Sequence, residues 1–139
     1  MTLFLLDTNT LTLLQRRHPR IVANISARIG DVVAVTSVNV EESLGGWYAM
    51  LRKARTNADQ AKAAARLANA VTNLSQFPIH PTTQASLDRY DTLVKMKLNV
   101  GRSDLKIAAL ALELGATVVS NNLRDFGRVP ALVVEDWTV

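Results

Sequence analysis

Four short apolar runs, rich in leucine and β-branched residues, are spaced along the chain, and polar or turn residues bound each of them. They are LFLLD near the start, DVVAVTS from residue 31, ATVVS from residue 116 and ALVVE from residue 131. Near-continuous apolar runs of this length are typical of parallel strands buried on both faces. The pattern therefore predicts strands of a mainly parallel sheet.

Helical patterns fill the spaces between these runs, because apolar residues recur there at intervals of three and four. The predicted helices cover residues 20–29, two stretches within 40–77 that break near Thr56-Asn57, residues 82–98, and residues 103–113. Ser103 is the expected N-cap of the last helix and Gly115 its expected end. The segment PIHP, residues 78–81, predicts a short extended piece. Alternating strands and helices indicate one α/β sandwich domain that spans residues 1–139.

The composition narrows the class of protein. Of 139 residues, 48% are hydrophobic and 20% charged, the balance of a globular protein with its own core. The sequence has no apolar run near the roughly 20 residues that span a bilayer. Its first residues also lack the basic region and cleavage site of a signal peptide. We therefore expect a cytoplasmic protein that makes no membrane contact.

The chain has no cysteine, and its two histidines, His18 and His80, each stand beside a proline. Thiolate chemistry and sulfur-bound zinc are thus excluded, and the chain has too few histidines to favour a histidine-based metal site. Any catalysis must use carboxylates. The net charge of +4 and the pI of about 9.9 favour an anionic partner, although a charge that serves solubility is an equally good interpretation.

Acidic residues follow the predicted strands. Asp7 ends the first run, Glu42 comes shortly after the second, and Asp104 lies in the first turn of a helix. Taken singly, Asp7 is a turn or N-cap residue, Glu42 or its neighbour Glu41 is a solvated helix residue, and Asp104 is a helix-start residue. Sites in open parallel sheets lie beyond the carboxyl ends of the strands. Shared position therefore makes these acids candidates for one site.

Carboxylates gathered at one place repel one another unless a cation neutralises them. Oxygen ligands without histidine or cysteine select Mg²⁺ or Mn²⁺, which activate water and clamp phosphate oxygens. The reaction that uses these properties is phosphodiester hydrolysis. If Asp7, Glu42, Asp104 and Asp125 form such a site, the rest of the chain contains 16 basic and eight acidic residues. Such a surplus suits a nucleic-acid backbone, and the candidate contacts are Arg16, Arg17, Arg52, Lys53, Arg55, Arg102, Arg124 and Arg128.

The segments LLDTN, TSVNVEESLGG, GRSDLKIAALALELGA and VVSNNLRDFGRVPALVVEDW resemble, in order and spacing, the PIN-domain ribonucleases. The similarity is greatest to the VapC toxins of type II toxin–antitoxin systems. It implies a three-layer α/β/α sandwich and an endoribonuclease that depends on Mg²⁺ or Mn²⁺. The acid cluster of the family maps onto Asp7, Glu42 and Asp104, with Asp125 as the fourth member; the register of the family pattern selects Glu42 over Glu41.

Three positions depart from the family pattern. Ser43 replaces the usual leucine after the acid, and Ser120 stands where threonine is commoner. Some relatives place their fourth acid at the position of Asn122, so that role falls either to Asp125 or to the Asn122 amide.

The implied mechanism has Asp7 and Asp104 bind the ion directly, while Glu42 and Asp125 complete the shell, orient water or hold a second ion. A water would attack the phosphorus in line and leave a 5′-phosphate and a 3′-hydroxyl. Asn9 would brace the loop that carries Asp7. The implied partners are an RNA substrate, a small VapB-like antitoxin whose tail occupies the acidic groove, and a second copy in a homodimer.

Two other functions share some of these sequence features. The haloacid-dehalogenase-like phosphatases also carry an aspartate after the first strand, but they need a second acid two residues on, where this chain has Asn9. A PIN-like module that binds RNA or a partner without cleaving is the other alternative, and the presence of all three principal acids disfavours it.

Overall fold

The central strand of the sheet is β1 (Leu3–Leu6), which carries Asp7 at its end. A computed structural model describes residues 1–139. The sheet has the order β3-β2-β1-β4-β5, and every pair of neighbours is parallel. The other strands are β2 (Val32–Thr36), β3 (Ile79–His80), β4 (Thr117–Val119) and β5 (Val133–Glu135). The four predicted strands and the parallel sheet are confirmed, and PIHP supplies the short fifth strand.

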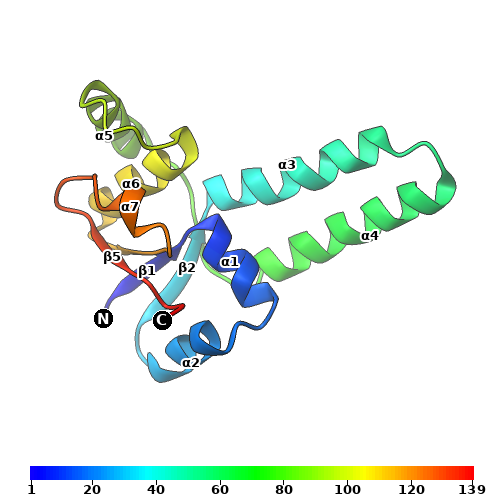
Figure 1. Ribbon diagram of the computed structural model, residues 1–139, viewed down its shortest axis with the longest axis horizontal. Helices are drawn as coiled ribbons and strands as arrows, with labels where there is room; N and C mark the ends of the chain where they lie inside the picture. Colours follow the sequence, from blue (N-terminus) through cyan, green and yellow to red (C-terminus); the bar gives the residue numbers. More distant parts are fainter.

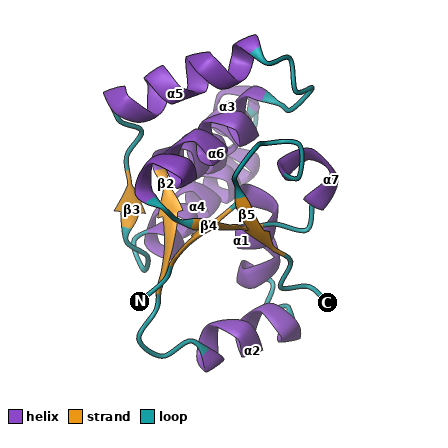
Figure 2. Cartoon of the chain, turned by 90° about the vertical axis from the view of Figure 1, so that its left-hand side faces the viewer, coloured by secondary structure: helices purple, strands orange, loops and turns teal.

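Seven helices connect and cover these strands. They are α1 (Thr8–Gln15), α2 (Pro19–Ala27), α3 (Ser37–Lys53), α4 (Asn57–Leu74), α5 (Gln84–Lys95), α6 (Arg102–Leu114) and α7 (Leu123–Phe126). Figure 2 shows the strands between α5 and α6 on one side and α1 and α2 on the other. This is the predicted three-layer α/β/α sandwich.

Alternating strand residues fill two separate cores. Leu5 packs with the α6 residues Ile107 and Leu110 on one face of the sheet. Phe4 and Leu6 pack on the other face with Leu11 of α1, and with residues of α2 and α4. Because successive side chains of a strand point to opposite faces, β1 must be apolar throughout, as its sequence is.

The predicted helices are present, and their ends differ from the predicted positions by a few residues. The break near Thr56-Asn57 is confirmed, since α4 begins at Asn57, and Gly115 ends α6 in the left-handed conformation, as expected. The prediction of Ser103 as an N-cap is wrong: Gly101 is the last non-helical residue, and α6 begins one residue earlier. Asp104 nevertheless lies in the first turn of α6.

Helix α1 was not predicted. Its sequence, TNTLTLLQ, contains three threonines, whose β-branched side chains lower helix propensity. The helix forms because Asp7 caps its first turn and because Thr10 and Leu11 are buried against the sheet. Tertiary packing here overrides local preference.

Helices α3 and α4 form an antiparallel hairpin that projects from the rest of the molecule (Figure 1). The first turns of α3 and the last turns of α4 adjoin the sheet, while the turn between the helices lies far from it. Further out, the guanidinium of Arg66 lies 5.5 Å from the ring centre of Trp47. None of the helices combines the length and apolarity that crossing a membrane requires.

Arg28, just after α2, holds the C-terminal segment against the sheet. Its guanidinium carbon lies 4.5 Å from the ring centre of Trp137 and 5.3 Å from that of Phe4. The same group pairs with Glu135 at 3.1 Å, and Glu135 also accepts the indole N–H of Trp137 at 3.0 Å. The Arg28 guanidinium thus makes cation–π contacts with two aromatic rings and an ion pair with a carboxylate.

We expect Arg28→Ala to lower the free energy of unfolding by about 2 kcal/mol, because stacked and paired contacts are lost together. The matched control is Arg89→Ala, which breaks an ion pair of a more exposed arginine, 45% against 25%, and is expected to cost about 0.5 kcal/mol. Urea unfolding measures both. Equal losses would show that Arg28 acts only as a surface charge.

Candidate active site

Asp7 is the most buried acid of the site, with 4% of its surface exposed. Its Oδ1 accepts the backbone N–H of Thr10 at 2.8 Å, which is the N-cap bond of α1. Its Oδ2 accepts the hydroxyl of Ser120 at 2.6 Å, from the end of the neighbouring strand β4. Each oxygen keeps a second lone pair that the cap does not use. Asp7 is therefore an N-cap and a potential ligand at once.

Glu42 reaches the site from α3. Its Oε1 accepts the hydroxyl of Thr8 at 2.6 Å, and Thr8 in turn accepts the side-chain amide of Asn39 at 3.1 Å. Glu42, and not Glu41, lines the cavity, in agreement with the register that the sequence suggested.

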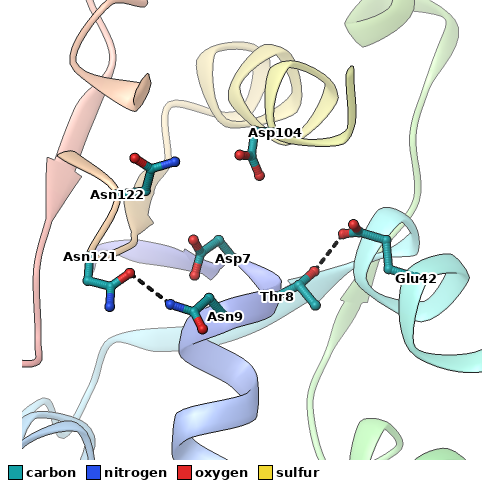
Figure 3. Close-up of a pocket in the computed structure, with 7 residues that line it drawn as sticks. All are labelled: Asp7, Thr8, Asn9, Glu42, Asp104, Asn121 and Asn122. Atoms are coloured by element: carbon teal, nitrogen blue, oxygen red, sulfur yellow. Dashed lines mark hydrogen bonds between the residues drawn. The ribbon is translucent and has the colours of Figure 1, made fainter. Parts of the chain in front are cut away.

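Asp104 faces Asp7 from the first turn of α6 (Figure 3). Burial, and then the charges of Asp7, Glu42 and Asp125, raise the pKa of Asp104 from 3.8 to about 6. A raised pKa means that the folded protein penalises the negative charge of this carboxylate. The site therefore gathers more negative charge than its own groups neutralise.

Three asparagines line the side of the cavity that lies at the end of β4: Asn9, Asn121 and Asn122. The amide of Asn9 donates to Asn121 at 2.8 Å, so the loops after β1 and β4 are tied together. Asn9 thus makes a bracing contact of the kind expected of it. Asn121 and Asn122 both line the cavity.

Asp125 does not line the cavity. It accepts the amide of Asn122 at 2.9 Å and pairs with Arg128 at 3.3 Å and with Arg124 at 3.8 Å. Its charge still acts on Asp104. The structure thus brings three of the four predicted acids to one cavity and places Asp125 beside it, linked through Asn122.

The cavity has a volume of about 550 Å³, and no hydrophobic residue lines it. Its lining consists of Asp7, Thr8, Asn9, Glu42, Asp104, Asn121 and Asn122. Carboxylate, hydroxyl and amide oxygens are the donor set that Mg²⁺ and Mn²⁺ prefer. The N-termini of α1 and α6 also point toward it, which favours negative charge there.

No three acidic or histidine side chains lie close enough to one another to share an ion directly as they stand. Magnesium usually keeps several waters and uses one or two carboxylates, so such an open arrangement fits a hydrated ion. Asp7 and Asp104, which face each other across the cavity, are the natural pair (Figure 3).

Some residues of the site were missed by sequence reasoning. Asn39 is completely buried, and Ser120 holds Asp7. An asparagine three residues after Thr36 signals a capping box, which the structure contains, but its second role toward Thr8 has no sequence signal. At Ser120 the sequence indicates only a hydroxyl in place of the commoner threonine, and not its contact with Asp7.

The basic candidates are divided among three regions. Arg102 begins α6 two residues before Asp104, and Arg124 and Arg128 flank Asp125. The remaining candidates lie elsewhere: Arg16 and Arg17 at the far end of α1, and Arg52, Lys53 and Arg55 at the outer end of the hairpin (Figure 1).

Comparison with known proteins gives consistent results. Residues 4–132 match the PIN domain family. Ribonuclease VapC2 of Haemophilus influenzae is 30% identical over 139 residues, which cover 99% of each protein. The tRNA(fMet)-specific endonuclease VapC of Salmonella typhimurium is 30% identical over 138 residues, again 99% of each. Among solved structures, a chain of VapBC2 from Rickettsia felis, bound to a fragment of promoter DNA, matches with a TM-score of 0.76 and 25% identity; the match covers 98% of this chain and 99% of that one.

The raised pKa of Asp104 predicts a pH dependence of stability in the metal-free protein. Between pH 3.8 and about 6 the folded state holds a proton that the unfolded state has lost. The contribution of Asp104 to the unfolding free energy is therefore complete below pH 3.8 and is lost as pH rises through about 6.

The variant Asp104→Asn removes this dependence. We expect the difference in unfolding free energy, wild type minus Asp104→Asn, to fall by about 1 to 2 kcal/mol between pH 4 and pH 7.5, after discounting for partial exposure. Urea unfolding with a chelator present measures it; a difference that does not change with pH would contradict the assignment.

Proposed function

The chain belongs to the PIN-domain family as a VapC-type endoribonuclease, and we propose that Asp7, Glu42 and Asp104 hold the Mg²⁺ or Mn²⁺ ion that RNA cleavage requires. The observation that supports this assignment best is the polar cavity at the carboxyl ends of β1 and β4. Three carboxylates from three separate elements line it, and burial, followed by the charges of the neighbouring acids, raises the pKa of Asp104.

Each side chain has a separate task in this proposal. Asp7, fixed on both oxygens by Thr10 and Ser120, supplies a rigid ligand. Asp104 is the second ligand, because a positive charge would offset the penalty that burial and the neighbouring acids place on its carboxylate. Glu42, exposed and held by Thr8, completes the shell of the ion. When bound, the ion would supply positive charge for the phosphate oxygens and lower the pKa of a water. Products with a 5′-phosphate and a 3′-hydroxyl are expected.

The fourth position is shared in this proposal. Asn122 lines the cavity and is the candidate neutral ligand, while Asp125 accepts the Asn122 amide and adds negative charge from behind it. Because Asp125 also pairs with Arg124 and Arg128, its charge is partly neutralised. We therefore expect Asp125 to orient Asn122 rather than to bind the ion itself.

RNA is the substrate and a small VapB-like antitoxin is the protein partner. Arg102, Arg124 and Arg128 adjoin the acids, so they are the basic residues best placed to contact phosphates that flank the cleaved bond. A second copy of the chain is the remaining predicted partner, and light scattering of the purified toxin tests the homodimer.

The two alternatives make different predictions. A phosphatase of the haloacid-dehalogenase type would need an acid at Asn9, whose amide instead donates to Asn121. A module that binds without cleaving would retain RNA binding but would not bind Mn²⁺ in calorimetry.

The first test is the cleavage of RNA by single variants. We expect Asp7→Asn and Asp104→Asn each to lower Mg²⁺-dependent cleavage by at least about 100-fold, because each removes a charged ligand. Asp104→Asn is the cleaner variant, since none of the hydrogen bonds that build the site uses Asp104. Gel analysis with mapping of the cut ends gives both rate and products.

The matched control is Asp88→Asn, which removes the same charge from an exposed position on α5. It should cleave at the wild-type rate, and circular dichroism should show that all three variants are folded. Near-normal cleavage by Asp7→Asn would refute the proposed site.

The second test is stabilisation by the metal. We expect saturating Mn²⁺ to raise the unfolding free energy of the wild type at pH 7.5 by about 2 to 3 kcal/mol, the value for a ligand at about 100 times its Kd. At pH 5 the gain should be smaller, because the ion then competes with the proton on Asp104, whose pKa is about 6. Thermal unfolding with and without Mn²⁺ measures this; an equal gain for Asp104→Asn would exclude that residue as a ligand.

A further inference from the structure

Resting on the proposed function, we infer that Thr8 is a positioning residue, whose hydroxyl, oriented by the buried amide of Asn39, sets the direction of the Glu42 carboxylate for metal binding. The chain of contacts runs from Asn39 Nδ2 to Thr8 Oγ1 at 3.1 Å and from Thr8 Oγ1 to Glu42 Oε1 at 2.6 Å. Neither Thr8 nor Asn39 was given this role by the sequence or by the comparisons.

The orientation of the Asn39 amide follows from its partners. Its oxygen accepts the backbone N–H of Thr36 at 2.6 Å and the Thr36 hydroxyl at 2.9 Å. A backbone N–H can only donate, so the amide oxygen must face Thr36 and the NH₂ group must face Thr8. With 0% of its surface exposed, Asn39 has no water to offer an alternative. The capping box of α3 therefore fixes which end of Asn39 meets Thr8.

The direction of the Thr8 hydroxyl follows in turn. An amide N–H that points at Thr8 Oγ1 occupies a lone pair, so the single hydroxyl proton is left to point at Glu42. The separation of 2.6 Å is that of a strong hydrogen bond to a charged carboxylate. One oxygen of Glu42 is thereby fixed, and the other is left for the cavity.

Thr8 joins the two sides of the site because of its place in the chain. It directly follows Asp7 and begins α1, whereas Glu42 lies in α3. The contact thus sets an exposed glutamate of one helix relative to the buried aspartate that ends β1. A flexible side chain such as Glu42 loses less freedom on binding an ion when it is already held.

The same arrangement recurs at Asp7. The backbone N–H of Asn122 donates to Ser120 Oγ at 2.9 Å, and Ser120 donates to Asp7 Oδ2 at 2.6 Å. In both cases an N–H fixes a hydroxyl, and that hydroxyl fixes a carboxylate. The repetition indicates that Thr8 serves Glu42 as Ser120 serves Asp7.

The test measures Mn²⁺ affinity by calorimetry for Thr8→Val, Thr8→Ser, Glu42→Gln and the double variant Thr8→Val/Glu42→Gln. Valine keeps the shape of threonine without its hydroxyl, and serine keeps the hydroxyl. We expect Thr8→Val to weaken Mn²⁺ binding by about 10- to 100-fold, as for other residues that orient ligands, and Thr8→Ser to bind within about 3-fold of wild type. In the Glu42→Gln background, Thr8→Val should have no further effect.

Thr12→Val is the matched control, because Thr12 lies one turn further along α1 and its hydroxyl only bonds the Thr8 carbonyl, at 3.0 Å. It should bind Mn²⁺ as the wild type does. If Thr8→Val does not fold, as judged by circular dichroism, Asn39→Asp replaces it: the acceptor toward Thr36 remains, but the amide donor toward Thr8 is lost. This variant should weaken Mn²⁺ binding while Thr8→Ser does not.

The outcomes separate the two proposals. If Glu42→Gln binds Mn²⁺ like the wild type, Glu42 is not a ligand and the proposed site itself fails. If Glu42→Gln weakens binding but Thr8→Val does not, or if Thr8→Val weakens it equally without Glu42, the positioning role of Thr8 is overturned.

Discussion

Repulsion between carboxylates that the fold forces together is the constraint on which the site depends. Parallel pairing of β1 with β2 and β4 brings the ends of these strands to one edge of the sheet, and the helices that follow them start there. Asp7 and Glu42 consequently share a cavity with Asp104, which the first turn of α6 brings there. Burial, and then the charges of the neighbouring acids, raise the pKa of Asp104, so the site disfavours this negative charge. A divalent cation bound in this cavity would relieve the repulsion between the carboxylates, so the site favours cation binding.

The fold contains this repulsion by hydrogen bonds. Ser120 and Thr8 each donate to a carboxylate, and each is fixed by an N–H behind it. The N-terminus of α1 also favours the negative charge of Asp7. These contacts hold the Asp7 and Glu42 carboxylates in place in the absence of a cation, so that little reorganisation is needed when one binds. Asp7 and Glu42 are thus held by the same kind of hydrogen-bonded contact.

Much of this architecture could be predicted from the sequence, for identifiable reasons. The buried parallel strands carry a continuous apolar signal, and the acids that follow them are placed by topology. Helix α1 could not be predicted because its stability comes from packing and from the Asp7 cap, whereas its threonines have low helix propensity. Asn39 escaped because its contact with Thr8 joins residues 31 positions apart, and such a contact leaves no local pattern. The prediction of Ser103 as an N-cap is wrong because α6 begins earlier, directly after Gly101, which places Ser103 inside the first turn.

The polarity of the cavity limits what it can recognise. With no hydrophobic lining residue, it provides charge and hydrogen bonds for a phosphate but no apolar surface on which a base could stack. Recognition of single-stranded or looped RNA relies on such stacking and on shape. The surfaces that choose the RNA must therefore lie outside the cavity. The projecting hairpin, with Arg52, Lys53 and Arg55 at its outer end, extends the basic surface well beyond the acids. The hairpin is therefore a candidate surface for RNA recognition, separate from the acids that are proposed to bind the ion.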